Sequence, residues 1–141
     1  MTPLNLTLAP PRSPRAELDG VIFLARSIDK VRATLPGGDP GAYRVAGLTQ
    51  TMLDVLRIEL DAFTRAVGAA AGDDDVVAFV REHAAPGTIG RWNELVARRE
   101  PREGNRAEAL GIYPWLAGRP DMLLVLDVLE EDDRLSFASA R

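Results

Sequence analysis

The sequence predicts an all-α fold, with a single compact domain of six to seven short helices over residues 13–141. Three observations predict it. Apolar residues recur at steps of three and four along most of the chain, as on one face of a helix. Helix-start signals alternate with glycine or proline stops at short intervals. No segment shows convincing strand alternation, although residues 122–129 are compatible with a strand.

The first segments are an arm and a helix start. Residues 1–12 contain three prolines and no helical periodicity, which predicts an extended N-terminal arm. Ser13 followed by Pro14 is an N-terminal helix signal, because Ser13 can cap and proline suits the first helical position. Gly20 ends this short turn.

The clearest helix is expected over residues 21–35. At about 100° per residue, Arg26, Asp29 and Lys30 fall opposite its apolar face, with Arg32 to one side. A Pro-Gly-Gly stop follows, and residues 37–47 form a glycine-rich loop that contains Tyr43. The apolar face consists of Val21, Leu24, Ile28, Val31 and Leu35.

The remaining helices are shorter and separated by turns. Thr49, Thr88 and Asp121 are expected to cap their helices, and either Asp73 or Asp74 caps another. A turn-rich connector over residues 111–120 should pack two aromatic side chains onto the core. The expected helices cover residues 48–56, 60–71, 73–84, 88–100, 105–110 and 121–131.

Composition excludes several classes of site and partner. There are no cysteines and one histidine, so no disulfide, thiolate nucleophile or metal cluster is expected, and no cofactor is predicted. Net charge is −4, with 8 basic and 7 acidic residues in 1–70 against 9 and 14 in 71–141, which argues against nucleic-acid binding. The apolar runs are too short to span a bilayer, and no secretion signal is recognised, so we expect a soluble, cytoplasmic protein.

The candidate site is centred on Lys30, the only lysine among seventeen basic residues. Arg26 and Lys30 lie four residues apart on one helix face, and Asp29 lies beside both. One interpretation is a solvated face, as runs of charge usually are. The other is an anion site in which Arg26 clamps a phosphate or carboxylate and Lys30 adds a second charge.

Neighbouring residues extend this candidate site. A helix N-terminus at Ser13 would present free N–H groups to an anion, with Arg12 and Arg15 flanking it. Arg32 and Tyr43 complete the set, although Tyr43 is also explained as a packed aromatic. The five carboxylates of residues 127–133 lack the spacing of a calcium loop and are interpreted as a solvated helix end.

Several of these segments together resemble a known family. The stretch PRSPRAELDGVIFLARSIDKVRA, the glycine turn before Tyr43, and the segments DVLRIELDAFTRAV and DDDVVAFVRE are similar to the bacterial domain-of-unknown-function family numbered five-zero-six-nine. The similarity is strongest over residues 10–84 and looser in RWNELV and the closing RPDMLLVLDVLEEDDR. It implies a small, mostly helical bacterial protein, and it implies no activity.

The chain departs from that family at three positions. Relatives usually carry glutamate at the position of Ala16, an acidic residue at Thr49, and glycine at Arg57. The first departure removes the glutamate of a capping box. The other two, at Thr49 and Arg57, change residues that a family site around residues 43–58 would use, and so argue against such a site in this chain.

Three functional hypotheses follow. The leading one is a non-enzymatic binding domain whose basic surface recognises a small anionic metabolite or the acidic segment of a protein partner. The second is an enzyme in which Lys30 is nucleophile or base and Asp29 orients it, which requires Lys30 to be withdrawn from solvent. The third is a structural or self-association module, acting as a homodimer with a large exposed apolar patch.

Overall fold

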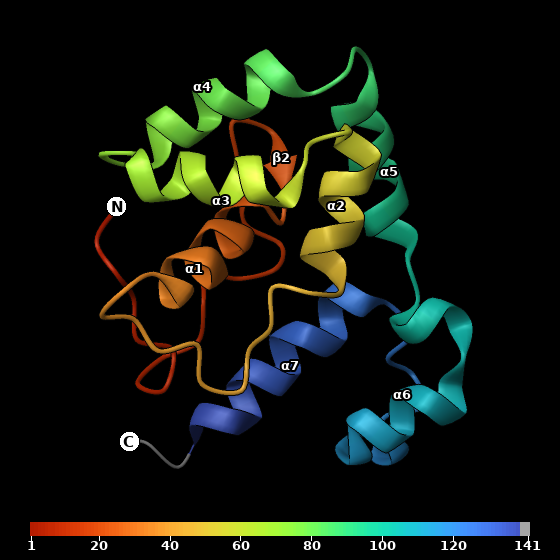
Figure 1. Cartoon of the computed structure of the whole chain (residues 1–141). Helices are drawn as coiled ribbons and strands as arrows, with labels where there is room; N and C mark the ends of the chain where they lie inside the picture. The colour runs from red at the N-terminus through yellow and green to blue at the C-terminus, as the bar shows by residue number, and fades with distance from the viewer. Residues whose placement is uncertain (139–141) are drawn as a thin grey trace. The chain divides into compact units, whose positions relative to one another are not determined.

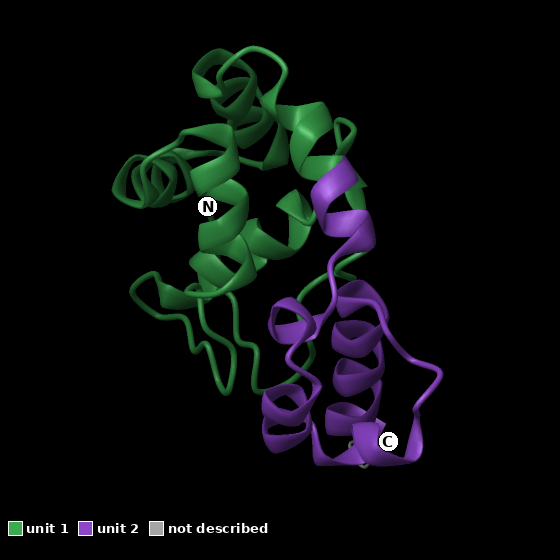
Figure 2. Ribbon diagram, turned by 90° about the vertical axis from the view of Figure 1, so that its right-hand side faces the viewer, with its two compact units in different colours: residues 1–93 green, residues 94–141 purple. Residues whose placement is uncertain are grey.

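The structure, a computed structural model, describes residues 1–138 and is mostly helical (Figure 1). The predicted all-α class is confirmed, and the described residues contain seven α-helices. The chain divides into two compact units, Met1–Asn93 and Glu94–Arg141, called unit 1 and unit 2 (Figure 2). The α-helices are α1 (Leu24–Thr34), α2 (Leu48–Leu56), α3 (Leu60–Ala69), α4 (Asp73–His83), α5 (Thr88–Arg98), α6 (Arg106–Ile112) and α7 (Val125–Phe137).

The N-terminal segment contains no helix and is held against other parts of unit 1. Leu6 is buried, and its backbone N–H donates to the Asp39 carbonyl at 2.8 Å, next to a β-bridge between Asn5 and Asp39. The Nε of Arg32 donates to the Thr2 carbonyl at 2.9 Å. Residues 1–12 are therefore fastened to the end of α1 and the loop that follows it.

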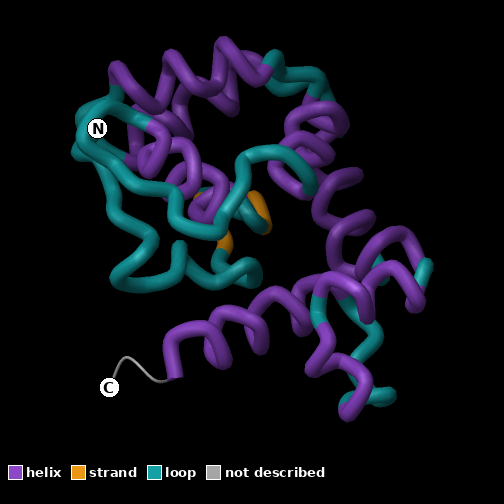
Figure 3. Tube along the Cα trace, turned by 60° about the horizontal axis from the view of Figure 1, so that its bottom comes forward, coloured by secondary structure: helices purple, strands orange, loops and turns teal. Residues whose placement is uncertain are grey.

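The predicted helix start at Ser13–Gly20 is wrong, because this segment forms a hairpin. Two short antiparallel strands, β1 (Glu17–Leu18) and β2 (Val21–Ile22), are the orange segments in Figure 3. The turn residues Asp19 and Gly20 have φ values of 51° and 75°, as a type I′ hairpin turn requires. The Asp-Gly pair outweighs the weak capping signal at Ser13, whose hydroxyl accepts from the backbone N–H of Arg15 in a turn that no helix follows.

Helix α1 begins three residues later than expected because Phe23 interrupts the helical backbone. Phe23 has a φ of 75°, in the left-handed region, and its side chain is fully buried. Its ring meets the ring of Trp92 edge-on at 6.5 Å, and the Trp92 indole donates to the Ile22 carbonyl at 2.7 Å. The hairpin, the start of α1 and α5 therefore meet at the Phe23–Trp92 aromatic pair.

Three predicted caps are also wrong. Gly47 precedes α2, and Thr49 lies inside the helix, where its hydroxyl bonds to Ser27 at 2.9 Å. Gly72 precedes α4, so Asp73 is its first residue. Thr88 is the first residue of α5 rather than the residue before it, and its hydroxyl donates to the Ala85 carbonyl.

Unit 2 has a small core of its own, built on Ala109, Leu116 and Val128. Its last helix starts at Val125 rather than Asp121. The guanidinium of Arg106 donates to the carbonyls of Leu116, Arg119 and Met122, which hold the chain before this helix in a non-helical path. The half-buried Trp115 packs on this core, as predicted, and donates to Asp132 at 2.9 Å. Two 3-10 helices, Pro101–Gly104 and Pro114–Gly118, connect its elements.

None of the helices described in either unit is long and apolar enough to cross a membrane.

Candidate functional site

The charged face of α1 is buried, so its interpretation as a solvated helix face is wrong. The exposed fractions are 2% for Arg26, 4% for Asp29 and 8% for Lys30. Periodicity separated this face correctly from the apolar one, but it could not show that the N-terminal segment would cover it. Burying charged groups is unfavourable unless opposite charges or hydrogen bonds compensate, and the contacts of Asp29 show part of this compensation.

Asp29 is the centre of an ion-pair network. Its Oδ2 accepts from the backbone N–H of Arg12 at 2.8 Å, and its Oδ1 lies 3.1 Å from Nη2 of the same residue. Nη1 of Arg32, one turn along α1, lies 3.6 Å from Oδ1. One buried carboxylate therefore connects the N-terminal segment to α1.

Arg12 binds a second carboxylate on its outer side. Nη1 and Nη2 of Arg12 donate to Oδ2 and Oδ1 of Asp73 at 2.7 and 3.0 Å. The hydrogen bond to Asp73 is the largest cause that raises the pKa of Arg12 above its ordinary value, with Asp29 adding to it. The same bond is the largest cause that holds the pKa of Asp73 below its ordinary value, opposed in part by desolvation.

Two aromatic rings hold the cations of α1. The guanidinium carbon of Arg26 lies 5.9 Å from the ring centre of Phe23 and 5.4 Å from that of Tyr43. Lys30 Nζ lies 5.7 Å from the ring centre of Phe23. Nη1 of Arg26 also donates to the Arg12 carbonyl at 3.3 Å. These cation–π contacts fix the orientation of both cations in a partly desolvated environment.

We call Arg12, Arg26, Lys30 and Arg32 around Asp29 the basic cluster. The structure brings together these five predicted residues, together with Tyr43. It does not support the predicted role of Ser13 as a helix N-terminus that binds an anion, because no helix begins there. Arg15 is exposed beside this turn.

Sequence reasoning missed two residues of the site. Asp73 was predicted only as a helix cap, and Phe23 was not singled out. Asp73 heads an acidic triplet at a helix start, a pattern explained by the helix dipole alone. Phe23 follows directly after the hairpin, so recognising Asp19-Gly20 as a turn would have pointed to it.

Other features do not add a site. Among residues 1–138, no three His, Cys, Asp or Glu side chains are grouped so that they could hold a metal ion. In the acidic run of α7, Glu131 pairs with Arg134 and Asp132 accepts from Trp115. An open depression of about 500 Å³ lies where α2 meets α3, lined by residues 50, 53, 54 and 57–61, and it contains no member of the basic cluster.

Comparison with known families gives a match over most of the chain. A family model described as a domain of unknown function (DUF5069) matches residues 8–135. The chain belongs to this family. No curated protein matches the sequence.

The DUF5069 match includes all of the basic cluster, its two aromatic rings and Asp73. The whole site therefore lies within the family domain. The DUF5069 description names no activity, and the function of a domain depends on the geometry of its site rather than on its fold.

Proposed function

We propose that this protein is a non-enzymatic domain that binds a small anionic metabolite through the basic cluster. The observation that carries the proposal is the gathering of four cationic side chains from two segments of the chain. Arg12 and Arg32 contact the buried carboxylate of Asp29, Arg26 donates to the Arg12 carbonyl, and Lys30 lies over the same Phe23 ring as Arg26. Arginine forks and lysine ammonium groups recognise carboxylate and phosphate groups directly.

The surroundings of the cluster support an anion as the ligand. Charge interactions are stronger where water is excluded, and Arg26 and Lys30 are both almost fully withdrawn from solvent. The aromatic contacts of Arg26 pre-orient its guanidinium, which lowers the entropy cost of binding. Burial of Arg26 and Lys30 leaves less room for an acidic protein segment than for a small metabolite, which is why a metabolite is proposed.

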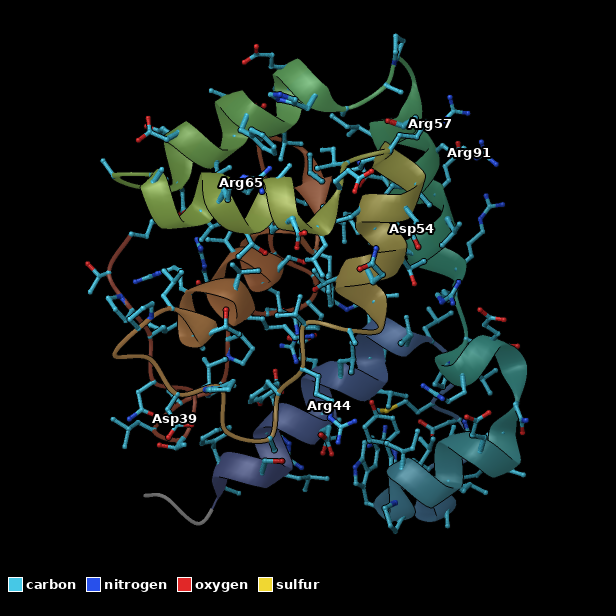
Figure 4. The ribbon with its side chains drawn as sticks, viewed as in Figure 1. Asp39, Arg44, Asp54, Arg57, Arg65 and Arg91 are labelled. Carbon is cyan, nitrogen blue, oxygen red and sulfur yellow. The ribbon has the colours of Figure 1, made fainter. Side chains whose placement is uncertain are left out.

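A thermal-shift screen tests the proposal. Wild type, Lys30→Gln and Arg91→Gln are melted with a panel of phosphorylated and carboxylated metabolites and with a poly-glutamate peptide. Arg91 is the matched control, because it is exposed and extends away from α5 (Figure 4) while its replacement removes the same charge. A ligand at 100 times its dissociation constant should add about 2.7 kcal/mol to the stability of wild type.

The expected result is a shift with at least one small anion in wild type and Arg91→Gln, reduced in Lys30→Gln. Arg26→Gln serves as a second variant, with its helical circular dichroism compared with wild type to show that it folds. Equal shifts in all the proteins, or no shift with any anion, would contradict the proposal. A shift with the peptide alone would replace the metabolite by an acidic partner.

A further inference from the structure

The outer edge of the Arg12 guanidinium is occupied by a carboxylate of the protein itself. Nη1 and Nη2 meet the two oxygens of Asp73 at 2.7 and 3.0 Å, one oxygen to each nitrogen. This parallel two-point contact is the one by which arginine binds a ligand carboxylate or one edge of a phosphate. Asp73 therefore has the geometry of a bound anion.

The inner edge of the same guanidinium is held independently. Nε of Arg12 lies 3.1 Å from Oδ2 of Asp29 and Nη2 lies 3.1 Å from Oδ1, while the backbone N–H of Arg12 donates at 2.8 Å. These bonds do not involve Asp73. Arg12 would keep its place and orientation if the Asp73 carboxylate left.

The two carboxylates differ in access to solvent. The side chain of Asp29 is 6% exposed, whereas those of Asp73 and Arg12 are 31% and 37% exposed. Ion pairs with this much exposure are weak and exchange readily with solvent ions. Asp73 is thus the carboxylate that an anion from solution can replace, and the position it leaves also feels the positive charge of Arg32.

We propose that Asp73 occupies, in the free protein, the position on Arg12 that the oxyanion of the ligand takes, and that a carboxylate or phosphate group binds by displacing it. This inference rests on the proposed function and adds the regulation of that site. A self-occupied site lowers the apparent affinity by the fraction of molecules in which Asp73 is in place. Removing the Asp73 charge should therefore tighten binding.

Isothermal titration calorimetry with inorganic phosphate tests the displacement. The variants are Asp73→Asn and Asp74→Asn, which remove one negative charge from adjacent residues in the first turn of α4. Arg12 donates to Asp73, whereas Asp74 is exposed. Comparing the two variants therefore separates displacement of the Asp73 carboxylate from the general electrostatic effect of removing one negative charge nearby. We expect phosphate to bind Asp73→Asn about two- to fivefold more tightly than Asp74→Asn, the range set by a partly exposed ion pair.

Two further proteins sharpen the test. In Asp73→Asn combined with Arg12→Gln, the gain in phosphate affinity should disappear, because the gain acts through Arg12. Asp73→Ala should reproduce the gain without an amide that can hydrogen-bond to Arg12. Titration with acetate in place of phosphate shows whether both oxyanions use the position, and melting temperatures verify that each variant is folded.

The outcomes separate this inference from the function on which it rests. Equal phosphate affinities of Asp73→Asn and Asp74→Asn overturn the displacement. If wild type binds an anion and Lys30→Gln weakens it while Asp73→Asn does not strengthen it, the binding function stands and only the displacement fails. If neither wild type nor Asp73→Asn binds any anion, both fail.

Discussion

Asp29 is the residue on which the candidate site depends. Its buried carboxylate accepts from the backbone and the side chain of Arg12 and lies close to Arg32. Removing one partner of a buried pair costs more than the pair itself contributes, because the remaining charge stays desolvated. The same Asp29 contacts therefore position the cations of the basic cluster and hold the N-terminal segment against α1.

The pKa of Asp73 leads to a prediction about acid stability. Its pKa lies below the ordinary value of 3.8, first because Arg12 donates to the ionised carboxylate. A lowered pKa contributes stability that is present above the unfolded-state pKa and is lost as the pH falls through the lower folded-state pKa. Wild type should therefore be more stable than Asp73→Asn at pH 6, and this advantage should shrink below about pH 4.

Urea unfolding of both proteins at pH 6 and pH 3 measures this difference in the free energy of unfolding. Asp74→Asn is the control, with the same change in charge and no role in the network. An advantage of wild type that stays constant between the two pH values would show that the Arg12–Asp73 pair does not contribute through ionisation.

At the scale of elements, the end of α1 depends on a close approach of the backbone at Gly38. A Cβ atom at this position would lie 2.5 Å from the Ala33 carbonyl oxygen and 2.9 Å from its carbon, and Ala33 is fully buried. The N–H of Gly38 donates to the Leu35 carbonyl at 2.8 Å, which fixes the turn. Only glycine fits here without moving the backbone.

Gly38→Ala should lower the free energy of unfolding by about 2 kcal/mol, the usual cost of forced overpacking. Gly90→Ala is the matched control, because it lies inside α5 with nothing within 4 Å of a new Cβ atom. That substitution should raise stability by about 0.5–1 kcal/mol through helix propensity. Urea unfolding of both variants measures the difference, and a loss of the same size at both positions would exclude the close contact as the cause.

Most helices were predictable from the sequence, and the differences have local or distant causes. Periodicity placed α2 at its observed bounds and α3, α4 and α5 within two residues of theirs. The hairpin was missed because two-residue strands are too short to alternate, although the Asp19-Gly20 pair signalled it. The start of α7 was misplaced because the side chain of Arg106, 16 residues before Met122, donates to backbone carbonyls in the preceding loop, a contact that local periodicity does not contain.

The residues of the candidate site were predictable from the sequence, but their burial was not. The opposite face of α1 and its flanking arginine residues were found from spacing alone. Burial was not, because it depends on which other segment lies over that face, and periodicity within one helix contains no such information. The role of Asp73 needed a contact between residues 61 positions apart.

At the scale of the whole molecule, the two units differ in how much core they contain. Most buried apolar residues belong to unit 1, including Phe23, Phe63 and Trp92, whereas the core cluster of unit 2 has three buried members. A short chain segment with a small core gains little stability from burial alone. Unit 2 should therefore open more readily than unit 1.

Native-state hydrogen exchange followed by mass spectrometry tests this expectation. Peptides from α6 and the following 3-10 helix should lose protection at a lower urea concentration than peptides from α1. Loss of protection at the same concentration in both would show instead that the chain unfolds as one cooperative unit.

The left-handed backbone at Phe23 has a consequence for the angular phase of α1. Because this residue forces the helix to start at Leu24, it sets the direction in which every later side chain points. One residue inserted between Phe23 and Arg26 would turn Arg26 and Lys30 by about 100° away from Tyr43 and the N-terminal segment. One inserted in the exposed turn at Asp19 and Gly20 would leave that phase unchanged. Phe23 thus separates a stretch of chain that tolerates changes in length from one that does not.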